Sequence, residues 1–188
     1  MIYILSDTNH FSKKIQKVIA LKLYQLITAD LNEKIDFFTE VFKPDENADE
    51  ILKDEQKLKD FLQKKCCGCY EEVLEVIRKY KENKNIEVIG ILPQKGVSFG
   101  IDKPFYENFE NKYNKKNTSI IHIGDSHRRY FVNELIKKRM KHKCYIFKEE
   151  VLPSSLLFDD WTITHVEGNK KIFIKELANE QECICYVF

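Results

Sequence analysis

Short apolar runs recur along the chain and alternate with longer segments whose apolar residues recur at helical spacing. Four of these runs are rich in β-branched or aromatic residues and end at polar, glycine or proline positions, which is typical of buried strands. They are Ile2 to Leu5, Ile86 to Leu92, Thr118 to Ile123 and Cys144 to Phe147. Helical patterns separate them, such as the one from Phe131 to Met140. This order predicts an α/β domain with a mainly parallel sheet.

The segment from residue 10 to residue 68 has a different pattern. Between residues 46 and 64, apolar residues such as Leu58 and Leu62 recur at helical intervals in strongly charged sequence, which indicates an exposed amphipathic helix. Ser12 is a suitable N-cap for an earlier helix, whereas Ile35 to Phe42 fits a strand or a helix. We therefore predict a Rossmann-like core domain, residues 1–9 and 69–188, and a small helical cap, residues 10–68, inserted after the first strand.

The C-terminal part of the chain contains a hairpin signal. Trp161 to Val166 and Lys171 to Ile174 flank the polar, glycine-containing segment Glu167 to Lys170. Two strand-like runs around such a segment predict a C-terminal β-hairpin.

Charge and hydropathy exclude several classes of partner. The chain has 31 Lys and Arg against 30 Asp and Glu, a net charge of +1, which is too small for a strongly electrostatic nucleic-acid binder. It has no apolar run of roughly 18 residues, the length that crosses a bilayer. The first residues lack the pattern of a signal peptide. We expect a cytoplasmic protein without nucleic-acid or membrane partners, and the oligomeric state stays open.

Six cysteines allow two interpretations. Cys66, Cys67 and Cys69 form a cluster, and the gap between Cys66 and Cys69 is that of a zinc half-site, but Cys183 and Cys185 have a poor spacing for the other half. In a cytoplasmic protein the expected state is reduced thiols without a metal. Zinc binding by these cysteines is the alternative.

Two aspartates follow predicted strands directly. Asp7 ends the first strand, and Asp125 follows Gly124 at the end of the strand that begins at Thr118. In open α/β sheets, ligands bind at the carboxyl ends of the strands, so both carboxylates are candidate functional groups. The alternative is structural, with Asp7 forming a turn and Asp125 capping the next helix.

These features resemble the haloacid dehalogenase-like hydrolases over much of the chain. The resemblance rests on Tyr3-Ile-Leu-Ser-Asp7, on the Lys103-Pro104 pair, and on Ile121-His-Ile-Gly-Asp-Ser126 about twenty residues later. In that family the first strand ends in a nucleophilic Asp, a helical cap follows, and a Gly-Asp turn binds the metal. The resemblance implies that Asp7 forms an aspartyl-phosphate, that Lys103 screens charge, and that Asp7 and Asp125 bind Mg²⁺.

The same family motifs are incomplete in this chain. Asn9 stands where the family has its general acid, and Tyr130 stands where a second acidic residue follows the Gly-Asp turn. The phosphate-binding Ser or Thr after the second strand has no match in Ile91 to Gln94. If the chain is an enzyme, the resemblance implies a weak Mg²⁺-dependent phosphatase, with Asp7, Asn9 and Lys103 at the catalytic positions, acting on a small phosphorylated molecule.

Two other functions fit the residues. The incomplete motifs favour a non-catalytic binding or regulatory module of the same fold. Gly124 to His127 also resembles the nucleophile block of SGNH-type esterases, with Ser126 as the nucleophile, although that family has the reverse order of motifs. His10, His127 and His165 are candidate bases or ligands, each with the alternative of an ordinary hydrogen-bonded histidine.

Overall fold

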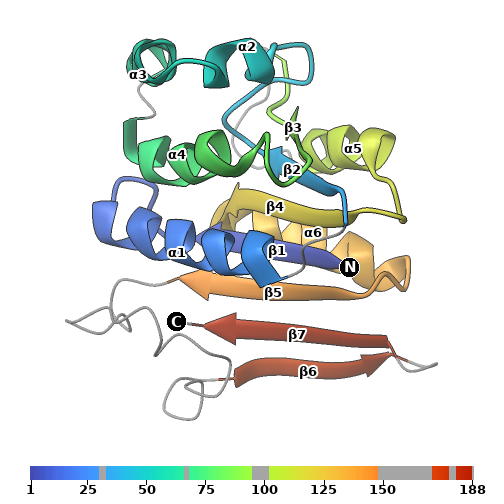
Figure 1. Ribbon diagram of the computed structural model, residues 1–188. Coiled ribbons are helices and arrows are strands. Elements are labelled where there is room, and N and C mark those ends of the chain that lie inside the picture. Colours follow the sequence, from blue (N-terminus) through green and yellow to red (C-terminus); the bar gives the residue numbers. More distant parts are fainter. Residues whose placement is uncertain (30–32, 66–67, 95–101, 148–170, 178–180, 188) are drawn as a thin grey trace.

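The computed structural model describes residues 1–29, 33–65, 68–94, 102–147, 171–177 and 181–187 of the 188-residue chain. Its central element is a parallel sheet of five strands in the order β3-β2-β4-β1-β5, and β7 and β6 extend it beyond β5 (Figure 1). The strands are β1 (Ile2–Asp7), β2 (Ile35–Thr39), β3 (Ile86–Gly90), β4 (Thr118–Gly124), β5 (His142–Phe147), β6 (Lys171–Leu177) and β7 (Gln181–Val187). The predicted α/β fold with a mainly parallel sheet is confirmed.

Helices cover both faces of the sheet. Figure 1 shows α1 and α4 in front of the strands and α6 behind them. The helices are α1 (Lys13–Ala29), α2 (Ala48–Leu52), α3 (Glu55–Lys64), the short 3₁₀ turn η1 (Gly68–Tyr70), α4 (Glu71–Tyr80), α5 (Lys103–Lys112) and α6 (Asp125–Lys137). In the part of the chain that the structure describes, no helix is long and apolar enough to cross a membrane.

The alternation of side chains along β1 divides the core into two halves. Leu5 faces the α1 and α4 side and packs in a cluster with Ile15 and Ile19 of α1. Ile4 faces the opposite side and packs with Phe131 of α6. Because a central strand is buried on both faces, its residues are apolar at nearly every position instead of at every second one.

The segment expected to be a helical cap contributes to the sheet instead. β2 lies between β3 and β4 and pairs with both in parallel, and α1 packs against β1 and α4. The amphipathic pattern did identify helices, because α2 and α3 lie within residues 46–64. The expectation of a cap was wrong for β2 because all five of its residues are buried, so its sequence has no alternation that marks a strand.

The C-terminal strands extend the sheet beyond β5. β7 pairs in parallel with β5, and β6 pairs with β7 in the antiparallel direction. The hairpin expected between residues 161–166 and 171–174 differs from this pair, and its first strand lies outside the described residues. Cys66 and Cys67 also lie outside them, so the state of the cysteine cluster stays a prediction.

Candidate active site

The candidate site lies at the carboxyl ends of β1, β2 and β4, where the chain changes direction across the sheet. β1 and β4 are neighbours, but α1 leads from β1 to β2 on one side, and α6 leads from β4 to β5 on the other. Neighbouring strands whose connections leave in opposite directions create a crevice at their carboxyl ends, which is where open α/β sheets bind ligands.

A tight turn after β1 brings His10 back over the strand end. Asn9 Oδ1 accepts a hydrogen bond from the Phe11 amide at 3.1 Å, and Ser12 Oγ caps α1 by accepting one from Ile15. The turn places His10 Nδ1 2.5 Å from the Asp7 Oδ1 atom. Asp7 is buried, and its other oxygen, Oδ2, accepts a hydrogen bond from Gln16 Nε2 at 3.2 Å. The carboxylate thus orients the imidazole from inside the protein.

The Asp7 carboxylate also shifts the pKa of His10. The hydrogen bond with Asp7 raises the pKa of His10, burial lowers it, and the charges of Asp7 and Glu40 raise it further. Nδ1 also lies 2.7 Å from the hydroxyl of Tyr70, whose own proton is donated to Glu40. With two oxygens beside it, Nδ1 is the nitrogen that carries the proton in neutral His10, which leaves the lone pair on Nε2.

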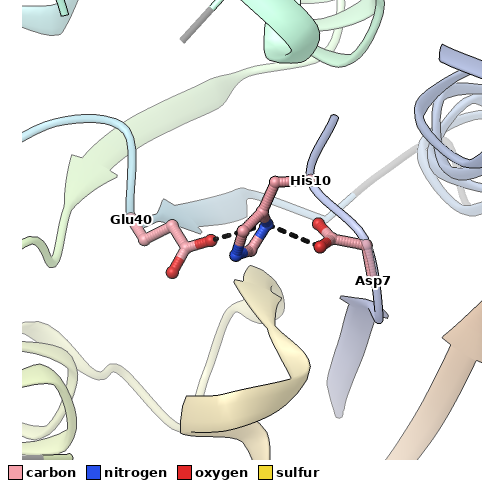
Figure 2. A group of neighbouring side chains, drawn as sticks. All are labelled: Asp7, His10 and Glu40. Carbon is pink, nitrogen blue, oxygen red and sulfur yellow. Dashed lines mark ion pairs between the residues drawn. The ribbon is translucent and has the colours of Figure 1, made fainter. Parts of the chain in front are cut away.

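Glu40 follows β2 directly and is the third member of the cluster that Figure 2 shows. Its Oε1 accepts hydrogen bonds from the Tyr70 hydroxyl and from the Gly124 amide, each at 2.9 Å. Burial raises the pKa of Glu40, while the positive charges of His10 and His127 oppose that rise. Two donors thus hold the buried Glu40 carboxyl group in place at the sheet edge.

The same three residues offer a set of possible metal ligands. One ligand atom each from Asp7, His10 and Glu40 lies within 4.8 Å of the others. However, His10 Nδ1 and Asp7 Oδ1 are 2.5 Å apart, which is a hydrogen-bonding distance. Two ligands at about 2.1 Å from one ion stand roughly 3 Å apart in octahedral geometry. The arrangement fits a proton-sharing network better than a metal held by these three atoms.

A second histidine–carboxylate pair lies on the other side of Glu40. His127 Nδ1 lies 2.7 Å from Asp102 Oδ1, and its ring stacks on Phe105 with centroids 4.2 Å apart. Its Nε2 is 4.0 Å from Glu40 Oε2, the oxygen that does not face Tyr70. Two carboxylate-oriented histidines therefore approach one buried glutamate, His10 at Oε1 and His127 at Oε2.

Gly124 is required by this packing. A Cβ atom at Gly124 would lie 2.3 Å from His10 Cε1 and 2.7 Å from His10 Nε2. The backbone angles of Gly124 are φ −65° and ψ 153°, which any residue can adopt. The glycine therefore serves close approach, since it lets the His10 ring lie against the end of β4.

The residues expected from the phosphatase resemblance do not meet in the same way. Asp125 begins α6 and forms an ion pair with Arg128 at 2.6 Å, Asn9 shapes the turn, and the Lys103 side chain is 69% exposed and pairs with Glu107 at 3.3 Å. Asp7 alone joins the cluster. A Mg²⁺ ion between Asp7 and Asp125 stays a prediction, and His165 lies outside the part that the structure describes.

Glu40 and Tyr70 were not identified as site residues from the sequence. Glu40 follows a strand end just as Asp7 does, so the signal was present but depended on recognising β2 as a strand. Tyr70 carries no signal of a site in the sequence. His10 was a candidate base, but the sequence does not show that the turn after β1 folds its ring back onto the Asp7 carboxylate.

Comparison with known proteins does not support the family that the motifs suggested. No protein-family model matches the chain, and no curated protein matches its sequence. Among solved structures, the chain is similar to "The structure of the type III effector HopBA1", with a TM-score of 0.55 and 16% sequence identity. The similarity covers 99% of this chain and 86% of that one, so the two share a fold over the whole chain.

This whole-chain similarity corrects the assignment to the haloacid dehalogenase-like hydrolases, and with it the phosphatase activity and the aspartyl-phosphate at Asp7. The physical reason is that the quoted motifs are short. An aspartate at the carboxyl end of a strand suits many open α/β sheets. Here the Gly124–Asp125 pair is explained by clearance for the His10 ring and by the Asp125–Arg128 contact.

Proposed function

We propose that the protein is a hydrolase that uses His10 as a general base on carbonyl esters. The observation that supports this proposal most is the convergence of two carboxylate-oriented histidines on the buried Glu40. A histidine held by a buried carboxylate is the arrangement with which many hydrolases activate water or a hydroxyl group. The location at the topological switch point of the sheet supports the same conclusion.

In the proposed reaction, a water molecule attacks the carbonyl carbon while His10 Nε2 takes one of its protons. Asp7 stabilises the imidazolium that forms, because its Oδ1 lies next to Nδ1. When the bond between carbon and the leaving oxygen breaks, that oxygen takes a proton from the imidazolium, which restores neutral His10. Glu40 Oε2 and His127 Nε2, which are 4.0 Å apart, can bind the substrate and exchange a proton with it.

The charges of the site favour an ester over a phosphate. Three carboxyl groups lie at one sheet edge, those of Asp7, Glu40 and Asp102. The first two each have an oxygen within 4.8 Å of a His10 ring nitrogen, and Asp102 contacts His127. A phosphate monoester carries up to two negative charges and would be repelled there, whereas a neutral ester is not. The preference follows from the same groups that orient the histidines.

The proposal is tested with chromogenic aryl and alkyl esters of short acids. We expect His10→Gln to lower the rate by about 10²–10⁴-fold, the usual contribution of a general base. His142→Gln is the control, because His142 begins β5 at the amino edge of the sheet, away from the site. A wild-type rate equal to the buffer blank on all esters, or an unchanged rate in a folded His10→Gln protein, would refute the proposal.

A further inference from the structure

His122 is a buried histidine whose ring nitrogens are unsatisfied. It lies in β4 on the α1 and α4 side of the sheet and is completely buried. Its ring stacks on Phe37 at 6.4 Å and meets Tyr70 edge-on at 5.1 Å. Within the described residues, neither Nδ1 nor Nε2 has a hydrogen-bond partner. Buried polar groups without a partner are rare, so each calls for an explanation such as an ion or an ordered water.

Asp7 Oδ2 lies near His122, and Gln16, which contacts the same oxygen, has an unsatisfied atom of its own. The His122 Nε2 atom is 3.8 Å from Asp7 Oδ2. Gln16, completely buried on α1, places its amide nitrogen 3.2 Å from the same oxygen, while its own Oε1 has no hydrogen-bond partner among the described residues. Turning the Gln16 amide over would break this hydrogen bond and place Oε1 against Asp7 Oδ2.

We propose that Asp7 Oδ2, His122 Nε2 and Gln16 Oε1 bind one divalent transition-metal ion of the Mn²⁺, Fe²⁺ or Zn²⁺ class. All three atoms carry lone pairs, and one belongs to a carboxylate. Oδ2 is 3.8 Å from His122 Nε2 and 3.2 Å from the Gln16 amide nitrogen, whose place Oε1 takes in the turned amide, and each of these separations suits two ligands about 2.1 Å from one ion. With the amide turned, two oxygens face each other, which is favourable only when a cation or a proton lies between them. The imidazole ligand favours these metals over Mg²⁺.

This ion is distinct from the Asp7–His10–Glu40 grouping. It lies on Asp7 Oδ2, whereas Oδ1 contacts His10 at 2.5 Å, so one carboxylate joins the ion to the histidine. Such a bridge between a metal and a histidine is a common way to fix the orientation of both. The inference does not depend on ester hydrolysis: it shares Asp7 with the proposed reaction, but His122 and Gln16 have no part in that reaction.

The competing explanation is a single internal water. A water molecule could also donate to Asp7 and Gln16 and accept from His122, and buried waters of this kind are common. The two explanations differ in measurable binding, because a water needs no added ion and does not compete with chelators.

Mn²⁺ is the probe, because it prefers nitrogen and oxygen ligands over the thiolates of the cysteine cluster. The full-length protein is first dialysed against a chelator, and Mn²⁺ is then titrated while the free ion is followed by electron paramagnetic resonance. We expect one ion per chain. We expect His122→Phe to weaken Mn²⁺ binding at least tenfold. Two controls, His142→Phe at another buried histidine and His10→Gln, should bind Mn²⁺ within about threefold of the wild-type affinity.

The wild-type protein also gives a readout that needs no variant. Pulsed electron paramagnetic resonance of bound Mn²⁺ should show coupling to one imidazole nitrogen, and Gln16→Met should weaken binding even if His122→Phe does not fold. Absence of a bound ion would mean that a water fills the gap. Loss of binding in His10→Gln and Glu40→Gln, with wild-type binding in Gln16→Met, would place the ion at the other grouping. Either result overturns the proposal.

Discussion

Gly124 offers the sharpest separation of catalysis from folding. In Gly124→Ala the new methyl group would meet the His10 ring at 2.3 Å, a distance that no packing tolerates. The ring is the end of a flexible side chain that is 37% exposed, so it can swing out into solvent. The backbone angles suit alanine, and the Gly124 amide can still donate to Glu40. The protein should therefore fold, with His10 displaced from Asp7.

The expected magnitudes follow from the contacts that are lost. Losing the charge-assisted contact between His10 and Asp7 costs about 1–3 kcal/mol. In a protein of this size each kcal/mol lowers Tm by about 2–4 °C, so we expect a decrease of roughly 2–12 °C. Ester hydrolysis should fall by about 10²–10⁴-fold, as in His10→Gln, because the base is absent from its position.

Gly90→Ala is the matched control. Its Cβ would lie 2.3 Å from the Lys43 carbonyl oxygen and 2.5 Å from that of Phe42, and both are backbone atoms that cannot swing away. This variant should lose stability, by about 3 kcal/mol or more, but keep the activity of each folded molecule. Thermal melts and ester assays on both proteins make the comparison. Activity within threefold of wild type in Gly124→Ala would refute the role given to His10.

Three further predictions concern stability. Lys22 is only 8% exposed, and burial lowers its pKa to about 8. Lys22→Met should therefore raise the free energy of unfolding by about 2 kcal/mol at pH 7. This gain should shrink as the pH rises from 8 to 10.5, because wild-type Lys22 then releases its proton on folding and the wild-type protein becomes more stable. Burial raises the pKa of Glu40 above its usual value of 4.5, so wild type loses stability as pH rises through the raised pKa. Glu40→Gln should therefore melt increasingly higher than wild type as the pH rises above 4.5. Phe109 packs against Phe38 and Phe131 and is completely buried, so Phe109→Ala should lower the free energy of unfolding in urea by about 3–5 kcal/mol. Equal melting temperatures of Glu40→Gln and wild type at all pH values, or Lys22→Met less stable than wild type at pH 7, would contradict these burial arguments.

The sequence predicted elements whose signal is local. The apolar runs at β1, β3, β4 and β5 became strands, and Ser12 caps α1 as its residue type suggested. β2 was left undecided because a strand buried on both faces has the same apolar pattern as a buried helix segment. The wrong prediction of a helical cap at residues 10–68 followed from the failure to recognise β2 as a strand.

The site was predictable only in part, for the same reason. Asp7 was identified because it ends a clear strand, while Glu40, which follows the undecided strand, was not. His10 and His127 were candidates by residue type alone. Their pairing with Asp7 and Asp102 depends on a turn and on the meeting of α5 and α6, which no local pattern encodes. Fold class is a short-range property here, whereas the chemistry is assembled from distant segments.

The position of β4 between β2 and β1 has a consequence for synthesis on the ribosome. β1 pairs with β4 and β5, which are separated from it by more than one hundred residues, so nothing translated before residue 118 pairs with β1 in the sheet. At about 5–20 residues per second, β1 waits roughly 5–25 s for its neighbour. During that time its two open edges are exposed to other chains. Slow, late closure around β4 should make the nascent chain dependent on chaperones, even though the finished sheet is well buried.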